Sequence, residues 1–177
     1  MRGPMKFSLP ASVAALALTL SGCSTYHHFM DYFSSSSPTA VYPQQAELDQ
    51  HIKACEQQQG EECIAAGTMY ELRGSHYYSQ ALRFYQLATG LKQPAAYSAL
   101  GHMFENGYAV PQDLTRAREL YQQGAELGDA TSYLYLSNLY RYGRGIDKDP
   151  AKARQYAILA CKKGNVVGCS ARNQIKK

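Results

Sequence analysis

Two stretches of the chain repeat the apolar spacing of a helix that buries one side. They are AAYSALGHMFEN, residues 95–106, and SYLYLSNLYRY, residues 132–142. Each places three apolar residues on one helical face: Leu100, Met103 and Phe104 in the first, and Leu136, Leu139 and Tyr140 in the second. Apolar residues three and four positions apart are typical of an amphipathic helix. Both stretches are therefore predicted to be helices, with these residues in the core.

Glycine and aspartate mark the predicted helix ends and starts. Gly107 and Gly143 follow the two apolar stretches, and glycine accepts the left-handed conformation that closes a helix. Asp149-Pro150 is typical of a helix start, because aspartate caps the first turn and proline suits the first helical position. Asp113 is predicted to cap in the same way. Second helices are therefore expected at about 114–127 and 150–163.

These signals recur at an interval of 36 residues. The interval relates five pairs: Leu100 and Leu136, Gly107 and Gly143, Asp113 and Asp149, Ala117 and Ala153, and Gly128 and Gly164. An earlier copy holds Gly67, Tyr70, Ala81 and Tyr85 and fits if its internal loop is shorter. Repetition at this period indicates stacked helical hairpins. The predicted fold is all-α, a short right-handed α-solenoid of about three hairpins with a cap at each end.

The first 22 residues are predicted to be a signal peptide that takes no part in the fold. A basic start precedes the apolar run FSLPASVAALALTL, which is shorter than the roughly 20 residues of a membrane span. The run ends at Leu20-Ser21-Gly22-Cys23, which resembles the lipobox of bacterial lipoproteins. The resemblance implies cleavage before Cys23 and attachment of lipid to it. An ordinary signal peptide that contains a cysteine is the alternative.

Residues 23–45 are predicted to be a lipidated, flexible tether, and residues 46–177 a single repeat domain. The tether contains a serine run and two prolines. Ser24, directly after the lipobox cysteine, favours sorting to the outer membrane, so the expected location is the cell envelope, facing the periplasm. His27, His28 and Asp31 lie in the tether, where solvated polar side chains are a better explanation than a metal site.

The charge of the mature chain is close to balanced. It has 16 Lys and Arg residues against 14 Asp and Glu residues, a net charge of +2. Nothing in this balance suggests nucleic acid as a partner.

Four cysteines remain in two similar stretches, ACEQQQGEEC and ACKKGNVVGC, and in each the cysteines are eight residues apart. One continuous helix would separate them by about 12 Å, whereas a disulfide needs Cα atoms within roughly 7 Å. Each pair is therefore either unbridged or joined across a turn of the chain. Among the three connectivities of four cysteines, the matching spacing favours Cys55–Cys63 and Cys161–Cys169. Neither pair has the spacing of a zinc site, and no metal site is predicted.

The repeat pattern resembles a known family. It reads A-x-x-x-L-G-x-x-[FY]-x-x-G followed by D-x-x-x-A, from Ala96 to Ala117 and again from Ser132 to Ala153. This pattern resembles the Sel-one-like repeats, a branch of the tetratricopeptide-type repeats, although Ser137 replaces the family glycine. The paired cysteines resemble the cysteine-rich subgroup. That resemblance implies disulfides between neighbouring helices, one at an N-terminal cap and one leading to a C-terminal cap at 170–177.

The resemblance also implies a curved surface, lined by the first helix of each hairpin, that binds a protein or peptide. Six polar or aromatic positions beside the buried stripes are predicted to contact this partner: Tyr97, His102, Glu105, Tyr133, Asn138 and Arg141. For Tyr97 and Tyr133, packing at the rim of the core is an equal alternative. Tyr121 and Tyr140 occupy core positions of the repeat and are predicted to pack there.

No catalytic residue and no cofactor is predicted. The chain has no nucleophile-elbow, P-loop or HExxH motif, and no serine lies three positions before a lysine as in penicillin-recognising enzymes. An enzyme that binds or hydrolyses β-lactams is an alternative through association with the cysteine-rich subgroup alone.

The expected function is that of a lipid-anchored protein-binding module. Lipoproteins that look like this one occur beside lipase effectors of type VI secretion. That likeness implies an immunity protein that neutralises a toxin in the periplasm. An envelope assembly scaffold and a host-interaction lipoprotein are the alternatives.

Overall fold

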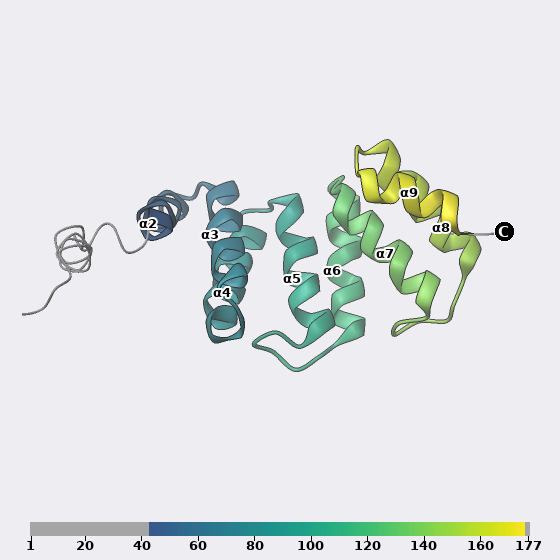
Figure 1. The fold of residues 1–177 in the computed structure, drawn as a ribbon, viewed down its shortest axis with the longest axis horizontal. Coiled ribbons are helices and arrows are strands. Elements are labelled where there is room, and N and C mark those ends of the chain that lie inside the picture. The colour runs from purple at the N-terminus through teal and green to yellow at the C-terminus, as the bar shows by residue number, and fades with distance from the viewer. Residues whose placement is uncertain (1–42, 176–177) are drawn as a thin grey trace, which may run out of the picture. The chain divides into compact units, whose positions relative to one another are not determined.

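The computed structural model describes residues 43–175, and the regular structure in this part of the chain is helical (Figure 1). In chain order the elements are α2 (Pro43–Glu56), α3 (Gly60–Leu72), the 3-10 helix η1 (Ser75–Tyr77), α4 (Tyr78–Gly90), α5 (Pro94–Asn106), α6 (Leu114–Glu126), α7 (Ala130–Tyr142), α8 (Pro150–Lys162) and α9 (Val166–Gln174). Within the described residues, no helix has the length and apolar character needed to span a membrane.

The start of the chain lies outside the described residues. The predicted signal peptide, the lipid attachment at Cys23 and most of the tether fall in this region. The first described helix begins at Pro43, slightly before the predicted domain start at residue 46.

Three hairpins form the body of the domain. They pair α3 with α4, α5 with α6, and α7 with α8, while α2 and α9 stand at the two ends (Figure 1). The first helices α3, α5, α7 and α9 also contact one another in succession. Over residues 43–175 the second helices α4, α6 and α8 make no comparable contact with each other. The first helices therefore lie on the inner side of the stack, and the predicted all-α solenoid is confirmed.

The helix ends follow the predicted signals. Gly107 and Gly143 both have φ of 70° and close α5 and α7 in the left-handed conformation. Asp113 and Asp149 cap α6 and α8, each accepting a hydrogen bond of 2.9 Å from a backbone N–H of the first turn. A third cap, Asp129 before α7, was not predicted, and it accepts from the backbone N–H of Ser132 at 2.7 Å. These caps satisfy N–H groups that a helix start leaves without intrahelical partners.

The predicted apolar stripes form the core. Met103, Leu136 and Leu139 are at most 1% exposed, and Tyr121 is fully buried. Phe104 is only partly buried and packs against two clusters, one shared by the first and second hairpins and one shared by the second and third. Burying an aliphatic or aromatic side chain of this size contributes roughly 1.5–3 kcal/mol. Continuous burial from one hairpin to the next therefore holds the stack together.

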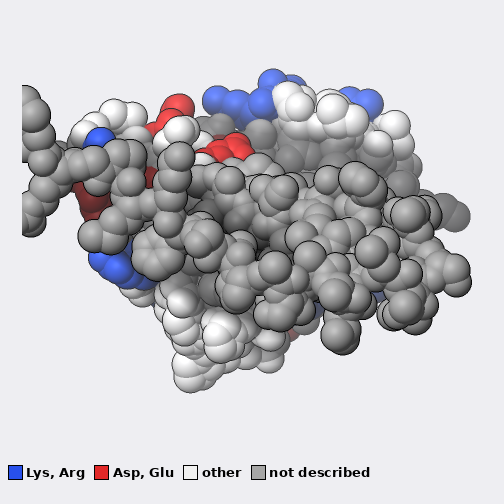
Figure 2. All heavy atoms as spheres, turned by 60° about the vertical axis from the view of Figure 1, so that its left-hand side comes forward, with Lys and Arg blue, Asp and Glu red and all other residues white. Residues whose placement is uncertain are grey.

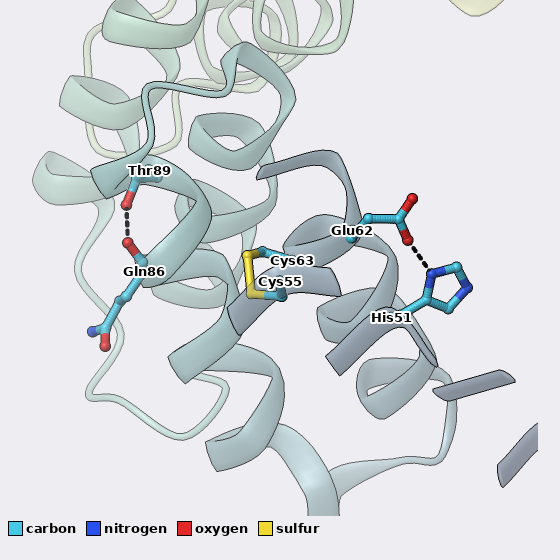
Figure 3. Close-up of a disulfide and its surroundings, with 6 residues drawn as sticks. All are labelled: His51, Cys55, Glu62, Cys63, Gln86 and Thr89. Atoms are coloured by element: carbon cyan, nitrogen blue, oxygen red, sulfur yellow. Dashed lines mark hydrogen bonds and ion pairs between the residues drawn. A yellow bond between two sulfur atoms is a disulfide. The ribbon is translucent and has the colours of Figure 1, made fainter. Parts of the chain in front are cut away.

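Both predicted cysteine pairs are bonded in the structure. Cys55 of α2 joins Cys63 of α3 (Figure 3), with Cα atoms 4.7 Å apart, and Cys161 of α8 joins Cys169 of α9 at 4.5 Å. The chain turns back within each loop, where Gln58 has φ of 64° and Gly164 has φ of 93°. Closing a loop of this length contributes about 2.5 kcal/mol in the chain-entropy model. Each disulfide therefore fixes a cap to the end of the stack.

The C-terminal cap begins earlier than predicted. It was expected at 170–177, but α9 starts at Val166, so Cys169 lies inside the cap helix. Asn165 explains the early start, because its side-chain oxygen accepts a hydrogen bond of 2.9 Å from the backbone N–H of Gly168.

Candidate functional site

A cluster of aromatic and ionisable side chains lies where the first helices meet on the inner side of the stack. We call it the inner-face cluster, and its members are Glu71, Tyr78, His102, Tyr108 and Tyr135. His102 of α5 is at its centre, with Nδ1 3.3 Å from Oε1 of Glu71 at the end of α3. The His102 ring stacks on Tyr135 of α7 at a centroid distance of 5.8 Å. One side chain thus links three successive hairpins.

The other two tyrosines of the cluster lie just after the end of α5 and at the start of α4. The ring of Tyr108 meets the His102 ring edge-on, with centroids 5.6 Å apart. Tyr78, at the start of α4, stacks on Tyr108 at 4.3 Å. All five members of the cluster are partly exposed, so they form a continuous surface rather than a closed core.

The carboxylate of Glu71 holds the His102 ring in place and is itself bonded to a tyrosine of α4. Its second oxygen accepts a hydrogen bond of 2.6 Å from the hydroxyl of Tyr85 on α4. The hydrogen bond from His102 lowers the pKa of Glu71, against the opposing effect of partial burial. Burial and the bond to Glu71 raise the pKa of Tyr85. At neutral pH Glu71 is therefore a charged acceptor that holds both Tyr85 and the His102 ring in place.

The next hairpin repeats the tyrosine–glutamate pair. The Tyr121 hydroxyl of α6 donates to Oε2 of Glu105 at 2.5 Å, and the other oxygen of Glu105 forms an ion pair with the Arg144 guanidinium at 2.5 Å. The ring of Tyr121 stacks on Tyr135 with centroids 4.7 Å apart. Burial and the neighbouring Glu105 raise the pKa of Tyr121, so its hydroxyl stays protonated and keeps donating. This second pair supports the inner-face cluster through Tyr135.

Glu105 does not occupy the position predicted for it. It was expected beside the buried stripe and open to a partner, but it is 5% exposed and both its oxygens are bonded within the domain. The reason is that Tyr121 reaches across from the second helix of the hairpin to bond it. Glu105 is therefore a support for the surface and not part of it.

The other five predicted contact residues lie in two kinds of place. His102 belongs to the inner-face cluster, with 31% of its side chain exposed. Tyr97 and Tyr133 are half-buried and pack against the cores of their hairpins, which matches the alternative of rim packing. Asn138 and Arg141 lie partly exposed on α7, and the guanidinium of Arg141 stands 5.2 Å from the centroid of the Tyr142 ring.

The repeat itself contains a signal for the residues that sequence reasoning missed. Tyr135 falls 36 residues after Ala99, so the third hairpin places a large ring where the second has a methyl group. Glu71 occupies the place in the first hairpin that Glu105 holds in the second. A comparison of the copies position by position would therefore have identified both residues.

The chemistry of the cluster suits contact better than catalysis. The hydroxyl that bonds the His102–Glu71 pair belongs to Tyr85, and burial raises the pKa of Tyr85 and of Tyr135. Such hydroxyls are neutral hydrogen-bond donors near pH 7. Between residues 43 and 175 no group of three or more His, Cys, Asp and Glu side chains is placed to hold a metal ion.

We expect acidification to remove the stabilising effect of Glu71. Because the folded state lowers the pKa of this carboxyl, its contribution is complete above the pKa of the unfolded chain and is lost as pH falls through the folded value. Glu71→Gln should therefore reduce the free energy of unfolding by about 1 kcal/mol at neutral pH and by much less at about pH 3. Urea denaturation at a series of pH values measures the difference.

An exposed glutamate on α6 provides the control for this series. Glu126→Gln is expected to change the free energy of unfolding by less than about 0.5 kcal/mol throughout. A difference between the native protein and Glu71→Gln that stayed constant with pH would contradict the role given to Glu71.

Stacked helical hairpins at a 36-residue interval define an α-solenoid repeat protein. The Sel1 repeat model matches residues 94–129 and 130–165, which are the hairpins α5–α6 and α7–α8, so the chain contains two Sel1 repeats. Repeats of this family mediate contacts between proteins and in general act as scaffolds rather than enzymes. The two Sel1 repeats accordingly indicate a module for protein interaction.

Solved structures give the same assignment of the fold. A Sel1 repeat protein from Oxalobacter formigenes has a TM-score of 0.61 and 31% identity, over 68% of this chain and 50% of that chain. A protective antigen of uropathogenic Escherichia coli strains, which displays an SLR fold, has a TM-score of 0.69 and 22% identity, over 75% and 29%. Cysteine rich protein B of Helicobacter pylori has a TM-score of 0.56 and 23% identity, over 71% and 92%.

This chain spans half the length of the Oxalobacter formigenes protein and less than a third of the Escherichia coli antigen. The two likenesses under 25% identity concern the fold alone. No curated protein matches the sequence.

Proposed function

We propose that the protein is a lipid-anchored, periplasm-facing module that binds a partner protein through the inner side of its helical stack. The inner-face cluster is the observation that carries this proposal. Its three tyrosines and His102 present large, partly exposed rings with few rotatable bonds, which is the composition that protein interfaces favour. Since Glu71 and Tyr85 already hold the His102 ring, little side-chain freedom is lost when a partner binds.

A hollow beside α3 extends the proposed surface toward the N-terminal cap. It has a volume of about 500 Å³ and lies between α2 and α3, with His51, Thr68, Met69 and Leu72 among its lining residues. Leu72, at the end of α3, is 82% exposed, which is unusual for a large apolar side chain in a folded domain. An apolar side chain of the partner would cover Leu72 and fill this hollow.

The sequence before the domain supports the location. The apolar run and Leu20-Ser21-Gly22-Cys23 have the order of a lipoprotein signal, with the acylated cysteine as the first residue of the mature chain. A small anchored binding module without a recognised catalytic motif suits an immunity protein. Its partner would then be a lipase-type toxin of type VI secretion that enters the periplasm.

Recovery of a partner from solubilised cell envelopes tests the proposed surface. We expect the lipidated full chain to retain one partner protein and the double variant His102→Ala/Tyr135→Ala to retain at least about tenfold less, because central aromatic contacts dominate interface energies. Gln122→Ala/Gln123→Ala, which changes two exposed residues of the second helix α6, is the matched control and should bind like the native chain.

A thermal melt must show that the double variant is folded, since Tyr135 also packs on Tyr121. Undiminished recovery of the same partner by the folded variant would rule out the inner-face cluster. The identity of the partner decides the biological role. A lipase whose toxicity the native chain suppresses would support immunity, whereas components of an envelope assembly would show a scaffold.

A further inference from the structure

The end of the chain carries basic charge alone. From Pro150 to Lys177 there are seven Lys and Arg residues and no Asp or Glu, whereas residues 43–149 contain nine Lys and Arg against thirteen Asp and Glu. Figure 2 shows a group of Lys and Arg atoms along the upper edge of this view, beside a smaller group of Asp and Glu atoms. A charge asymmetry of this kind within one domain indicates that the basic end meets an anionic surface.

Two valines stand at the tip of this basic end. Val166 is 78% exposed and Val167 is 61% exposed, at the first turn of α9. Lys162, the last residue of α8, and Lys163, directly after it, are also exposed. We call these four residues the basic corner. Side chains that are apolar at the tip and basic at the flank are typical of segments that dip into a membrane interface.

The basic corner is held rigid by its surroundings. The disulfide Cys161–Cys169 closes the loop that contains all four residues. Gly168 packs so closely on α8 that a Cβ there would lie 2.6 Å from the Cβ of Ala160. Gly168 thus holds one side of α9 against α8, and Val166 and Val167 lie on the part of α9 that faces solvent.

The matching corner at the other end of the stack has the opposite character. The loop closed by the disulfide Cys55–Cys63 (Figure 3) reads EQQQGEE, so it holds three glutamates and no large apolar residue. The two loops have the same length and the same disulfide. The exposed valines and lysines are therefore not a requirement of a disulfide-closed corner.

The outer face of α8 continues the basic corner. Arg154, Ile158 and Lys162 follow one another at intervals of four residues and so lie along one side of the helix. Arg154 and Ile158 also line a shallow hollow of about 310 Å³ on this face. Basic and apolar side chains thus alternate over the length of α8 up to the two valines.

We propose that the basic corner and the outer face of α8 bind a membrane surface rich in acidic phospholipid, with Val166 and Val167 entering the headgroup region. The two lysines would be attracted to anionic headgroups, and the two valines would be buried among them. Membrane binding therefore accounts for both the basic charge and the exposed apolar side chains of the basic corner. The inference rests on the proposed attachment to the membrane, since a lipid anchor keeps the domain close to such a surface. A second contact would fix the orientation of the stack on the membrane.

Vesicle sedimentation tests this contact without the lipid anchor and without a partner protein. The chain from Ser24 onward keeps every described helix and lacks the leader and the acylated cysteine. We expect it to bind vesicles of phosphatidylcholine with added phosphatidylglycerol and not vesicles of phosphatidylcholine alone. Lys162→Gln/Lys163→Gln should weaken this binding by about twenty-five-fold, at about fivefold for each lysine near the surface. Val166→Ser/Val167→Ser should weaken it by about fivefold.

Lys92→Gln/Lys148→Gln is the matched control, because it removes the same charge from two exposed lysines elsewhere on the domain. We expect it to weaken binding less than about twofold. Equal loss in the control, or no preference for acidic vesicles, would overturn the proposal.

The vesicle test is independent of the inner-face cluster. His102→Ala/Tyr135→Ala should bind vesicles like the native chain, whatever becomes of its partner. If the native chain did not bind vesicles, the proposed membrane contact would be wrong, but the proposed partner surface would not be affected.

Discussion

Replacing Gly101 with alanine is expected to destabilise the protein by about 2 kcal/mol, the cost of overpacking a filled core. A Cβ at this position would lie 2.5 Å from Cε1 of Tyr121 and 2.7 Å from its Cδ1. The ring has nowhere to move, because it is fully buried, donates to Glu105 and stacks on Tyr135. Urea denaturation followed by circular dichroism measures the loss.

Gly90 provides a control of opposite sign. It is the last residue of α4, and a Cβ there would meet nothing within 4 Å. Gly90→Ala should therefore stabilise the protein by about 0.5 kcal/mol through the lower entropy of the unfolded chain and the helix preference of alanine. If both substitutions had the same small effect, the close approach of Tyr121 to Gly101 would not matter for stability.

The third hairpin shows how the clash is avoided. Ser137 stands where the second hairpin has Gly101, and Ala157 stands where it has Tyr121. The Ser137 hydroxyl occupies the freed space and donates to the carbonyl oxygen of Ala153 at 2.7 Å. Gly101→Ser and Tyr121→Ala should therefore be coupled, with the double variant about 2 kcal/mol more stable than the sum of the two single losses. Additive losses would contradict this explanation.

The sequence predicted the architecture because its signals are local. The helix caps at Asp113 and Asp149, the closing glycines at 107 and 143, and the apolar stripes each depend on residues within one or two turns. Their recurrence at 36 residues then indicated how the hairpins stack. The replacement of the family glycine by Ser137 was visible as a departure. The physical reason for this replacement could not be predicted, because the residue that makes room for Ser137 is Ala157, which lies on another helix.

The candidate site could be predicted only in part for the same reason. His102 was identified from its place beside the buried stripe, and the structure puts it at the centre of the inner-face cluster. Glu105 has the same kind of place in the sequence, yet it is buried, because its bonding depends on Tyr121 and Arg144. Contacts between helices decide which polar residues near a stripe remain exposed.

Removing Arg144 is expected to have the second large effect on stability. Its guanidinium is bonded to Glu105, a carboxylate whose side chain is 6% exposed. Breaking a fully buried ion pair by deleting one partner costs about 3–5 kcal/mol, since the remaining charge has no compensation. Solvent reaches the Arg144 side chain, which is 43% exposed, so we expect Arg144→Ala to cost about 2 kcal/mol.

Neutralising Glu105 isolates the charge from other effects of this substitution. In a Glu105→Gln background, Arg144→Ala should cost only about 0.5 kcal/mol, because no buried carboxylate is then left without its partner. Arg141→Ala is the control on the same side of the stack, and its guanidinium lies over the exposed Tyr142 ring, so a change within about 0.5 kcal/mol is expected. An equal loss for Arg144→Ala in both backgrounds would show that the arginine acts through packing alone.

The position of Arg144 makes this pair a link between repeats. Glu105 belongs to α5, whereas Arg144 lies in the loop between α7 and α8, so the bond joins the second hairpin to the third. In a repeat protein, contacts between neighbouring hairpins make unfolding cooperative. Arg144→Ala should therefore lower the dependence of the unfolding free energy on urea concentration as well as the midpoint, whereas Gly101→Ala should lower the midpoint alone. An unchanged dependence in Arg144→Ala would mean that apolar packing between α5 and α7 suffices to couple the two hairpins.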